Sequence, residues 1–199
     1  MDSDDLQLCQ ESLRGHKNRF KLRIRSYTDE PDYPRFFEIK RRINTIINKS
    51  RARVMDRDVP ILLTGLSLPP QNYTADIDSI NQFQLYMKSI GARPMVLIRY
   101  MRQAFEGTSE NKVRVTFDRE LAYCVTNRPE VRLGGSGWQR NPFTEQGGVI
   151  LEIKFTNNYP AWLSHMVKYF NLEARSISKF GSSITDSRLL EYYVPQLTF

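Results

Sequence analysis

Basic and apolar residues alternate at a period of two in five short segments between Lys21 and Lys154. Successive side chains of a β-strand point to opposite faces of the sheet, so each segment is predicted to be a strand with one apolar and one charged face. We therefore expect a sheet that carries a field of positive charge. The charged positions are Lys21, Arg23, Arg25, Glu38, Lys40, Lys49, Arg51, Arg53, Lys112, Arg114, Asp118, Glu152 and Lys154.

The hydrophobic pattern predicts more strands than helices. Turn residues between the strands predict hairpins, and two apolar stripes at helical spacing follow Asp78 and Pro160. Residues 56–75 receive no assignment, and the glycine-rich residues 126–148 are predicted to be a flexible connection. We find no repeat or linker and expect one domain over residues 1–199. The predicted strands are residues 20–27, 35–42, 49–55, 95–105, 112–124 and 149–155.

Composition favours a polyanionic partner. The 199 residues include 29 basic and 22 acidic ones, and the net charge of +7 suits a nucleotide, polyphosphate, nucleic acid or a membrane surface. Cys9 and Cys124 are too few for a disulfide framework, which favours a reducing compartment. No apolar run approaches the roughly 20 residues of a membrane helix. We expect a soluble, cytoplasmic protein.

Familiar catalytic motifs are mostly absent. The segment from Gly134 to Gly137 is not followed by the Lys-Ser or Lys-Thr of a phosphate-binding P-loop, so we interpret it as an ordinary loop. His16 and His165 have no second ligand at a suggestive spacing, which gives little support to zinc or serine-hydrolase chemistry. The charged strand faces are the remaining candidate site.

Two interpretations of these faces stay open from the residues alone. A polar outer face is common in antiparallel sheets, and a solvated face is the simpler interpretation. However, cations greatly outnumber acids at the alternating positions, and like charges opposed across a sheet destabilise it. If the sheet curls into a barrel, the cations converge inward, and an anion would be needed to neutralise them. The residues favour the anion site by a small margin.

Seven segments in order resemble the VTC (vacuolar transporter chaperone) polyphosphate polymerase domain, a triphosphate tunnel metalloenzyme related to the CYTH group. No single segment is specific, but together they cover nearly the whole chain. The resemblance implies an α+β fold that is mainly antiparallel: a triphosphate-tunnel β-barrel with basic residues inside and flanking helices. The segments are residues 21–27, 37–41, 49–53, 100–105, 114–118, 151–155 and 178–180.

The implied activity is transfer of the γ-phosphoryl group of ATP to an inorganic polyphosphate chain, with Mn²⁺ or Mg²⁺ as the cofactor. The implied partners are ATP and polyphosphate, and an inositol phosphate and a membrane protein at the cytoplasmic face of a membrane are further candidates. No nucleic acid is expected, because the charged faces lack interleaved aromatic residues. Triphosphate hydrolysis, nucleotide cyclisation and a non-catalytic module that binds polyphosphate or inositol phosphate remain alternatives.

The resemblance also assigns roles to individual residues. It implies that Glu152 binds the metal. Arginine forks bind phosphate oxygens bidentately and lysines act as point charges, so these residue types suit a triphosphate. The implied catalytic residues are Arg23, Arg25, Lys40, Arg102, Arg114 and Lys154. The implied phosphate-binding residues are these six together with Lys49, Arg51 and Lys179.

The chain departs from the family pattern at its start. The resemblance implies that the first tunnel strands, with at least one phosphate-binding lysine, are missing before Met1. We therefore expect a barrel that is incomplete at the N-terminus, with unpaired strand edges. We also expect lower activity than that of a full-length version.

Overall fold

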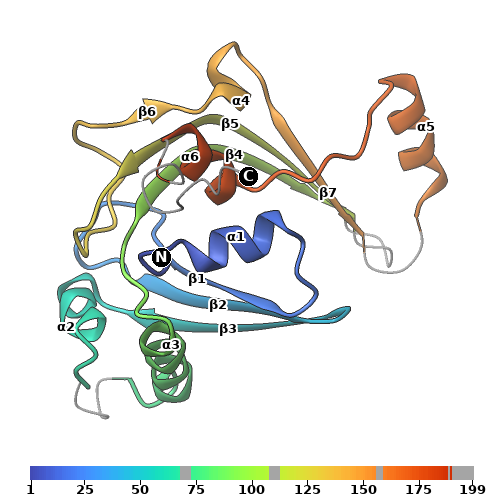
Figure 1. The fold of residues 1–199 in the computed structure, drawn as a ribbon. Helices are drawn as coiled ribbons and strands as arrows, with labels where there is room; N and C mark the ends of the chain where they lie inside the picture. The colour runs from blue at the N-terminus through green and yellow to red at the C-terminus, as the bar shows by residue number, and fades with distance from the viewer. Residues whose placement is uncertain (68–72, 108–112, 156–158, 188, 190–199) are drawn as a thin grey trace, which may run out of the picture.

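Two antiparallel sheets and the helices around them make up this α+β fold (Figure 1). The computed structural model describes residues 1–67, 73–107, 113–155, 159–187 and 189. In the first sheet β2 lies between β1 and β3, and in the second sheet β5 pairs with β4, β6 and β7. The strands are β1 (Arg19–Arg25), β2 (Arg35–Ile43), β3 (Ile46–Val54), β4 (Val96–Glu106), β5 (Val113–Val125), β6 (Gln139–Arg140) and β7 (Ile150–Phe155).

Two helices lie on one face of the first sheet, and another lies against its edge strand β1 (Figure 1). The helices α2 and α3 are on the outer side, and α1 and α6 lie between the two sheets in Figure 1. The helix α1 contacts β1 and α6, and α6 contacts β4. The helices are α1 (Gln7–Leu13), the 3-10 helix η1 (Asp56–Asp58), α2 (Val59–Leu63), α3 (Ile77–Ser89), α4 (Pro142–Glu145), α5 (Ala161–Tyr169) and α6 (Lys179–Asp186).

The apolar face of the first sheet packs against α3. Phe37 of β2 is buried and its ring centroid lies 4.7 Å from that of Phe83 on α3. Ala52 and Val54 of β3 belong to the same buried cluster. The apolar face of the strands and the apolar stripe of α3 thus pack into one core. The other face of the sheet therefore points away from α3.

The register of the first sheet places its cations in rows on that other face. Lys21, Lys40 and Lys49 are opposite one another across the three strands. The next row along the sheet holds Arg23, Glu38 and Arg51. The following row holds Arg25, Phe36 and Arg53. The alternation that predicts one apolar and one charged face is confirmed for this sheet.

The second sheet repeats the arrangement with fewer cations. Arg102 of β4 is opposite Asp118 of β5, and Arg114 of β5 is opposite Lys154 of β7. The register between β4 and β5 shifts between Arg99 and Met101, where Glu120 and Leu121 of β5 oppose the single residue Tyr100, so β5 carries a β-bulge. These charged positions therefore share one face of the sheet, beside the bulge.

A short N-terminal segment fixes α1 near the first sheet. The carboxylate of Asp2 is buried and accepts hydrogen bonds from the backbone N–H groups of Leu8 and Cys9, both at 2.8 Å. Asp2 also forms an antiparallel bridge with Arg93, just before β4. Cys9 is buried in a second apolar cluster with Ile184 of α6. This cluster occupies the space between the sheets at the end where α1 and α6 meet.

Several sequence predictions need correction. The connection predicted over residues 126–148 contains β6 and α4, and α1, α2 and α6 were not predicted. The antiparallel α+β class is confirmed, but among the described residues the strands form two sheets with no strand pairing between them. A closed barrel therefore stays a prediction. Lys112, the first residue of a predicted strand, lies outside the described residues.

Truncating Phe83 to alanine should strongly destabilise the fold. The side chain is fully buried against Phe37, so Phe83→Ala should lower the free energy of unfolding by about 3–5 kcal/mol through lost burial and a new cavity. Leu85→Ala, on the exposed side of the same helix, is the matched control and should change it by less than about 0.5 kcal/mol. Urea unfolding followed by circular dichroism measures both, and equal effects would contradict the assigned core.

Candidate phosphate-binding site

Glu38 is the centre of the cations on the first sheet. Its carboxylate lies 2.5 Å from the Arg23 guanidinium, 3.5 Å from Nε of Arg51 and 3.9 Å from Nε of Arg25. The Glu38 side chain is largely buried beneath these arginines. One carboxylate from β2 thus holds arginines from β1 and β3 in a fixed group, which offsets part of their repulsion.

Asp118 has the same role on the second sheet. It accepts a bidentate hydrogen bond from Arg102, with Nε to Oδ1 at 2.6 Å and Nη2 to Oδ2 at 2.7 Å. The Lys179 ammonium at the start of α6 lies 2.7 Å from Oδ2. Burial alone would raise the pKa of Asp118, but the hydrogen bonds from Arg102 and Lys179 outweigh it, so the pKa is lowered. Asp118 is therefore a buried anion that ties α6 to β4 and β5.

Glu152 is the half-exposed carboxylate of this sheet. Oε1 lies 3.1 Å from Nζ of Lys154, and Oε2 lies 3.7 Å from Nη2 of Arg102. Its register partner on β5 is Thr116, whose buried hydroxyl Oγ1 has no hydrogen-bond partner within the described part of the chain. A carboxylate and an unsatisfied hydroxyl therefore occupy neighbouring strands at the edge of the cation group.

Lys40 of the first sheet is influenced by charges on the second sheet. Burial together with Lys49 and Lys154 lowers the pKa of Lys40, and Glu152 acts in the opposite direction. Lys49 belongs to the first sheet, whereas Lys154 and Glu152 belong to the second. The side chain of Lys40 is therefore within electrostatic reach of β7, although its own strand is in the other sheet.

Tyr100 is an aromatic residue beside the cations of the second sheet. It lies on β4 where the register with β5 shifts. The Lys179 ammonium lies 5.1 Å from the centre of the Tyr100 ring, and the Arg102 guanidinium lies 5.2 Å from it. An aromatic face at this distance attracts cations, so Tyr100 helps to keep them together.

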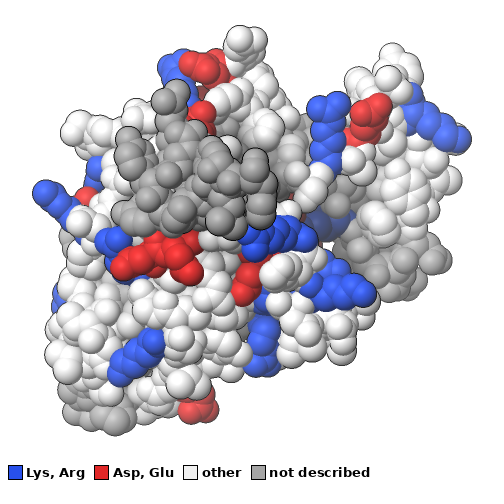
Figure 2. All heavy atoms as spheres, viewed as in Figure 1, with Lys and Arg blue, Asp and Glu red and all other residues white. Residues whose placement is uncertain are grey.

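The predicted phosphate-binding residues lie on the charged faces of the two sheets, and we call these faces together the basic site. Figure 2 shows basic side chains gathering between the β1–β3 layer and α5 in this view. Within the described residues, Lys40, Lys49 and Arg114 form no ion pair, so their charges are not balanced by a carboxylate. The basic site comprises Arg23, Arg25, Lys40, Lys49, Arg51, Arg102, Arg114, Lys154 and Lys179 with the carboxylates Glu38, Asp118 and Glu152.

Sequence reasoning missed the organising roles of some of these residues. In the sequence, Glu38 and Asp118 are recognisable only as acids among basic residues. This isolated position was the available signal of their role. Strand alternation places Tyr100 on the same face as Arg102, two residues further along β4, so this contact had a signal in the sequence. The expectation that the charged faces lack aromatic residues is also wrong at Phe36, which lies in the row of Arg25 and Arg53.

A divalent cation fits this chemistry only if phosphate supplies part of its coordination. Among the described residues no group of three or more acidic, histidine or cysteine side chains could hold a metal by itself. Glu152 and the unsatisfied Thr116 hydroxyl offer hard oxygen atoms on adjacent strands. Mg²⁺ commonly uses one or two carboxylates together with substrate phosphates, which agrees with this small donor set.

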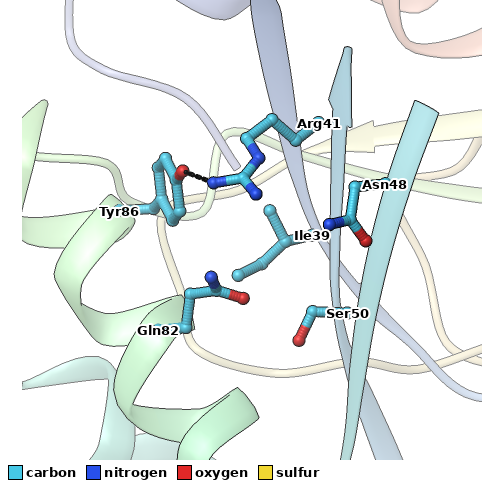
Figure 3. A pocket seen from close by; sticks show the side chains of 6 residues that line it. All are labelled: Ile39, Arg41, Asn48, Ser50, Gln82 and Tyr86. Atoms are coloured by element: carbon cyan, nitrogen blue, oxygen red, sulfur yellow. Dashed lines mark hydrogen bonds between the residues drawn. The ribbon is translucent and has the colours of Figure 1, made fainter. Parts of the chain in front are cut away.

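A small polar pocket lies on the opposite face of the first sheet, between β2, β3 and α3 (Figure 3). Arg41 donates a hydrogen bond to the hydroxyl of Tyr86 at 2.8 Å across this pocket. Asn48, Ser50 and Gln82 complete its polar lining. Since Arg41 is already satisfied and the pocket is small, we do not assign it to the basic site.

Comparison with known families agrees with the geometry. A family model described as the VTC domain matches residues 1–187. The chain belongs to the VTC domain family. No curated protein sequence matches this VTC domain. In the part of it that the structure describes, no helix is both long and apolar enough to cross a membrane.

Asp118→Asn should destabilise this VTC domain at neutral pH. The amide keeps the shape of the side chain but leaves Arg102 and Lys179 without their buried counter-ion. We expect a loss of roughly 2–4 kcal/mol at pH 7, near the low end for a broken buried pair because both cations are partly exposed. Urea unfolding measures the change. Asp4→Asn, at a largely exposed ion pair, is the control and should cost less than about 1 kcal/mol.

The effect of Asp118→Asn should also depend on pH. The folded-state pKa of Asp118 lies below its ordinary value of 3.8, so the carboxylate stabilises the fold at pH values above 3.8. This stabilisation is lost as the pH falls through the lowered folded-state pKa. The difference between wild type and variant should therefore be full at pH 7 and shrink below about pH 4. A difference that stays constant down to pH 2.5 would show that the charge is not its cause.

Proposed function

We propose that this VTC domain is a polyphosphate polymerase, which transfers the γ-phosphoryl group of ATP to an inorganic polyphosphate chain in the basic site. Membership of the family supports a function related to polyphosphate synthesis. The observation that carries the proposal is that the charged face of each sheet gathers cations around a carboxylate, Glu38 on the first sheet and Asp118 on the second. A linear polyanion bound between these groups would contact cations of both sheets.

The distribution of the cations suits a chain of phosphates. Arg23, Arg25 and Arg51 already share one carboxylate, so their guanidinium groups are held close together. Guanidinium forks can bind two phosphate oxygens each, and unpaired lysines such as Lys40 and Lys49 add point charges. Phosphate oxygens point in several directions, and cations from opposite sheets would meet them from both sides.

The reaction needs positioning and charge stabilisation more than covalent chemistry by the protein. The bond between the γ-phosphorus and the bridging oxygen of ATP breaks, ADP leaves, and a terminal oxygen of polyphosphate forms the new bond to phosphorus. Arg102, Arg114 and Lys154 would hold the phosphates in line and stabilise the charge that develops on the transferred group. Lys40 would contribute from the facing sheet.

Glu152 is the residue that we propose for the divalent cation, Mn²⁺ or Mg²⁺, with the Thr116 hydroxyl beside it. When bound, the ion would neutralise charge on the phosphate oxygens during transfer. Glu152 would have to leave its present ion pairs with Lys154 and Arg102, both of which are weak enough for exchange at a half-exposed position. The released cations would then be available to phosphate.

The proposal places the protein in a reducing, cytoplasmic compartment. Cys9 and Cys124 are both free thiols, which agrees with such a compartment. ATP and inorganic polyphosphate are the proposed partners, and a membrane protein that receives the product and an inositol phosphate ligand remain part of the proposal. No observation favours a nucleic acid over these phosphate ligands.

Glu152→Ala should separate catalysis from binding. Loss of the metal-binding carboxylate should lower polyphosphate formation from ATP and Mn²⁺ by about 100-fold or more. Affinity for inorganic tripolyphosphate should stay within a few-fold of wild type, because the cations remain. Gel analysis of the product and isothermal titration calorimetry measure the two effects. Glu145→Ala, at an exposed position on α4, is the matched control and should leave both unchanged.

The same assay distinguishes the alternative functions. Release of free phosphate from ATP without growth of a chain would identify a triphosphate hydrolase, and formation of a cyclic nucleotide would identify a cyclase. Tight binding of tripolyphosphate by wild type, with no product under any condition, would identify a non-catalytic binding module. Failure of wild type to bind any phosphate ligand would contradict the proposed function.

A further inference from the structure

Three aromatic rings form an exposed cluster where the β1–β2 hairpin turns. The ring centroid of Tyr27 lies 6.4 Å from that of Tyr33 and 5.7 Å from that of Phe36, and all three pairs meet edge to face. Tyr27 is 55% exposed and Tyr33 is 36% exposed. Edge-to-face packing uses the edges of some rings and leaves ring surface open to solvent. Tyr27 and Tyr33 therefore offer aromatic surface to solvent, whereas Phe36 is partly buried behind them.

This aromatic cluster is continuous with the arginines of the basic site. The Arg51 guanidinium lies 3.8 Å from the centre of the Phe36 ring, and Nη1 of Arg25 donates to the Tyr27 hydroxyl at 3.1 Å. Phe36 is in the row next to that of Glu38, two residues along β2, which corresponds to about 7 Å. A ligand whose phosphates contact Arg25 and Arg51 would thus have aromatic rings immediately beside it.

The turn that carries the cluster is held in place by a buried arginine. The buried guanidinium of Arg35 donates to the carbonyl oxygens of Thr28 and Tyr33, both at 3.1 Å, and its Nε lies 2.8 Å from the Asp56 carboxylate. These bonds fix the backbone on both sides of the turn. The rings are therefore presented by an ordered turn, so a ligand would lose little affinity in ordering them.

A loop of the second sheet binds the same turn. The carboxylate of Asp29 accepts hydrogen bonds from the backbone N–H groups of Leu133 at 2.6 Å and Gly134 at 2.9 Å. A Cβ atom on Gly134 would lie 3.3 Å from that carboxylate, which leaves little room for a side chain. The glycine-rich loop, which lacks the features of a P-loop, thus joins the two sheets beside the aromatic cluster.

We propose that Tyr27, Tyr33 and Phe36 form a subsite for the base of a nucleoside triphosphate whose phosphates lie on Arg25 and Arg51. The inference rests on the proposed function and adds the part of the substrate that inorganic polyphosphate lacks. Phosphate needs only cations, whereas a purine stacks on aromatic rings with a gain of about 1–3 kcal/mol per base. Exposed rings directly beside phosphate-binding arginines supply both kinds of contact.

The test compares ATP with inorganic tripolyphosphate, which has the phosphates but no base. Calorimetry in EDTA, where no transfer occurs, gives the dissociation constant of each ligand for the purified chain. Tyr27→Ala should raise the dissociation constant of ATP at least fivefold and leave that of tripolyphosphate within twofold. Tyr27→Phe keeps the ring and loses the hydroxyl, and it should bind ATP within twofold of wild type.

Further variants exclude indirect effects. Tyr33→Ala should show the same selective loss and provides the answer if Tyr27→Ala fails to fold by circular dichroism. Tyr169→Ala is the matched control, since this tyrosine is 84% exposed on α5, which stands away from both sheets (Figure 1), and it should change neither constant.

The outcomes separate the inference from the proposed function. Equal weakening of ATP binding and tripolyphosphate binding would mean that the rings only position the arginines. An unchanged dissociation constant for ATP in both alanine variants would mean that the base binds elsewhere. Either result overturns the base subsite and leaves the polymerase proposal intact. If wild type binds neither ligand, the proposed function fails and the inference fails with it.

Discussion

Repulsion between like charges is the constraint on which the basic site depends. Each ion pair that its cations form, among the residues the structure describes, involves Glu38, Asp118 or Glu152. These carboxylates have different environments: Asp118 is completely buried, Glu38 is largely covered by arginines, and Glu152 is half-exposed. The first two hold the cations in position, whereas the third is exposed enough to exchange its partners, and burial thus separates the structural carboxylates from the one that we propose for the metal.

The direction of the charged faces follows from where the apolar faces are satisfied. Phe37, Ala52 and Val54 bury one face of the first sheet against α3. Strand alternation then places the side chains of Lys40 and Arg51 on the opposite face. A one-residue slip of β2 would place Phe37 among cations and Glu38 in the core, at a cost in both places. The helices on the outside therefore specify the basic site as much as the basic residues themselves.

Strand alternation made the faces and most of the strands predictable, because the signal is local. The tertiary partners of the charges were not predictable in this way. Lys179 reaches Asp118 through a helix that follows a segment without clear periodicity, and the β5 bulge opposite Tyr100 has no signature in the alternation. The sequence resemblance named Lys179 but could not give its partner. Whether the sheets close into a barrel depends on edges that local pattern does not determine.

Lys40 shows how a ligand would complete this arrangement. Its pKa is lowered by burial and by Lys49 and Lys154, so keeping it protonated costs free energy in the protein without a ligand. A phosphate between the sheets would add negative charge beside Lys40 and raise its pKa again. Binding would thus offset the free-energy cost of keeping Lys40 protonated. The same phosphate would contact the unpaired Lys49 and Arg114. The imbalance of charge among these cations is thus the source of the affinity that we propose for a polyanion.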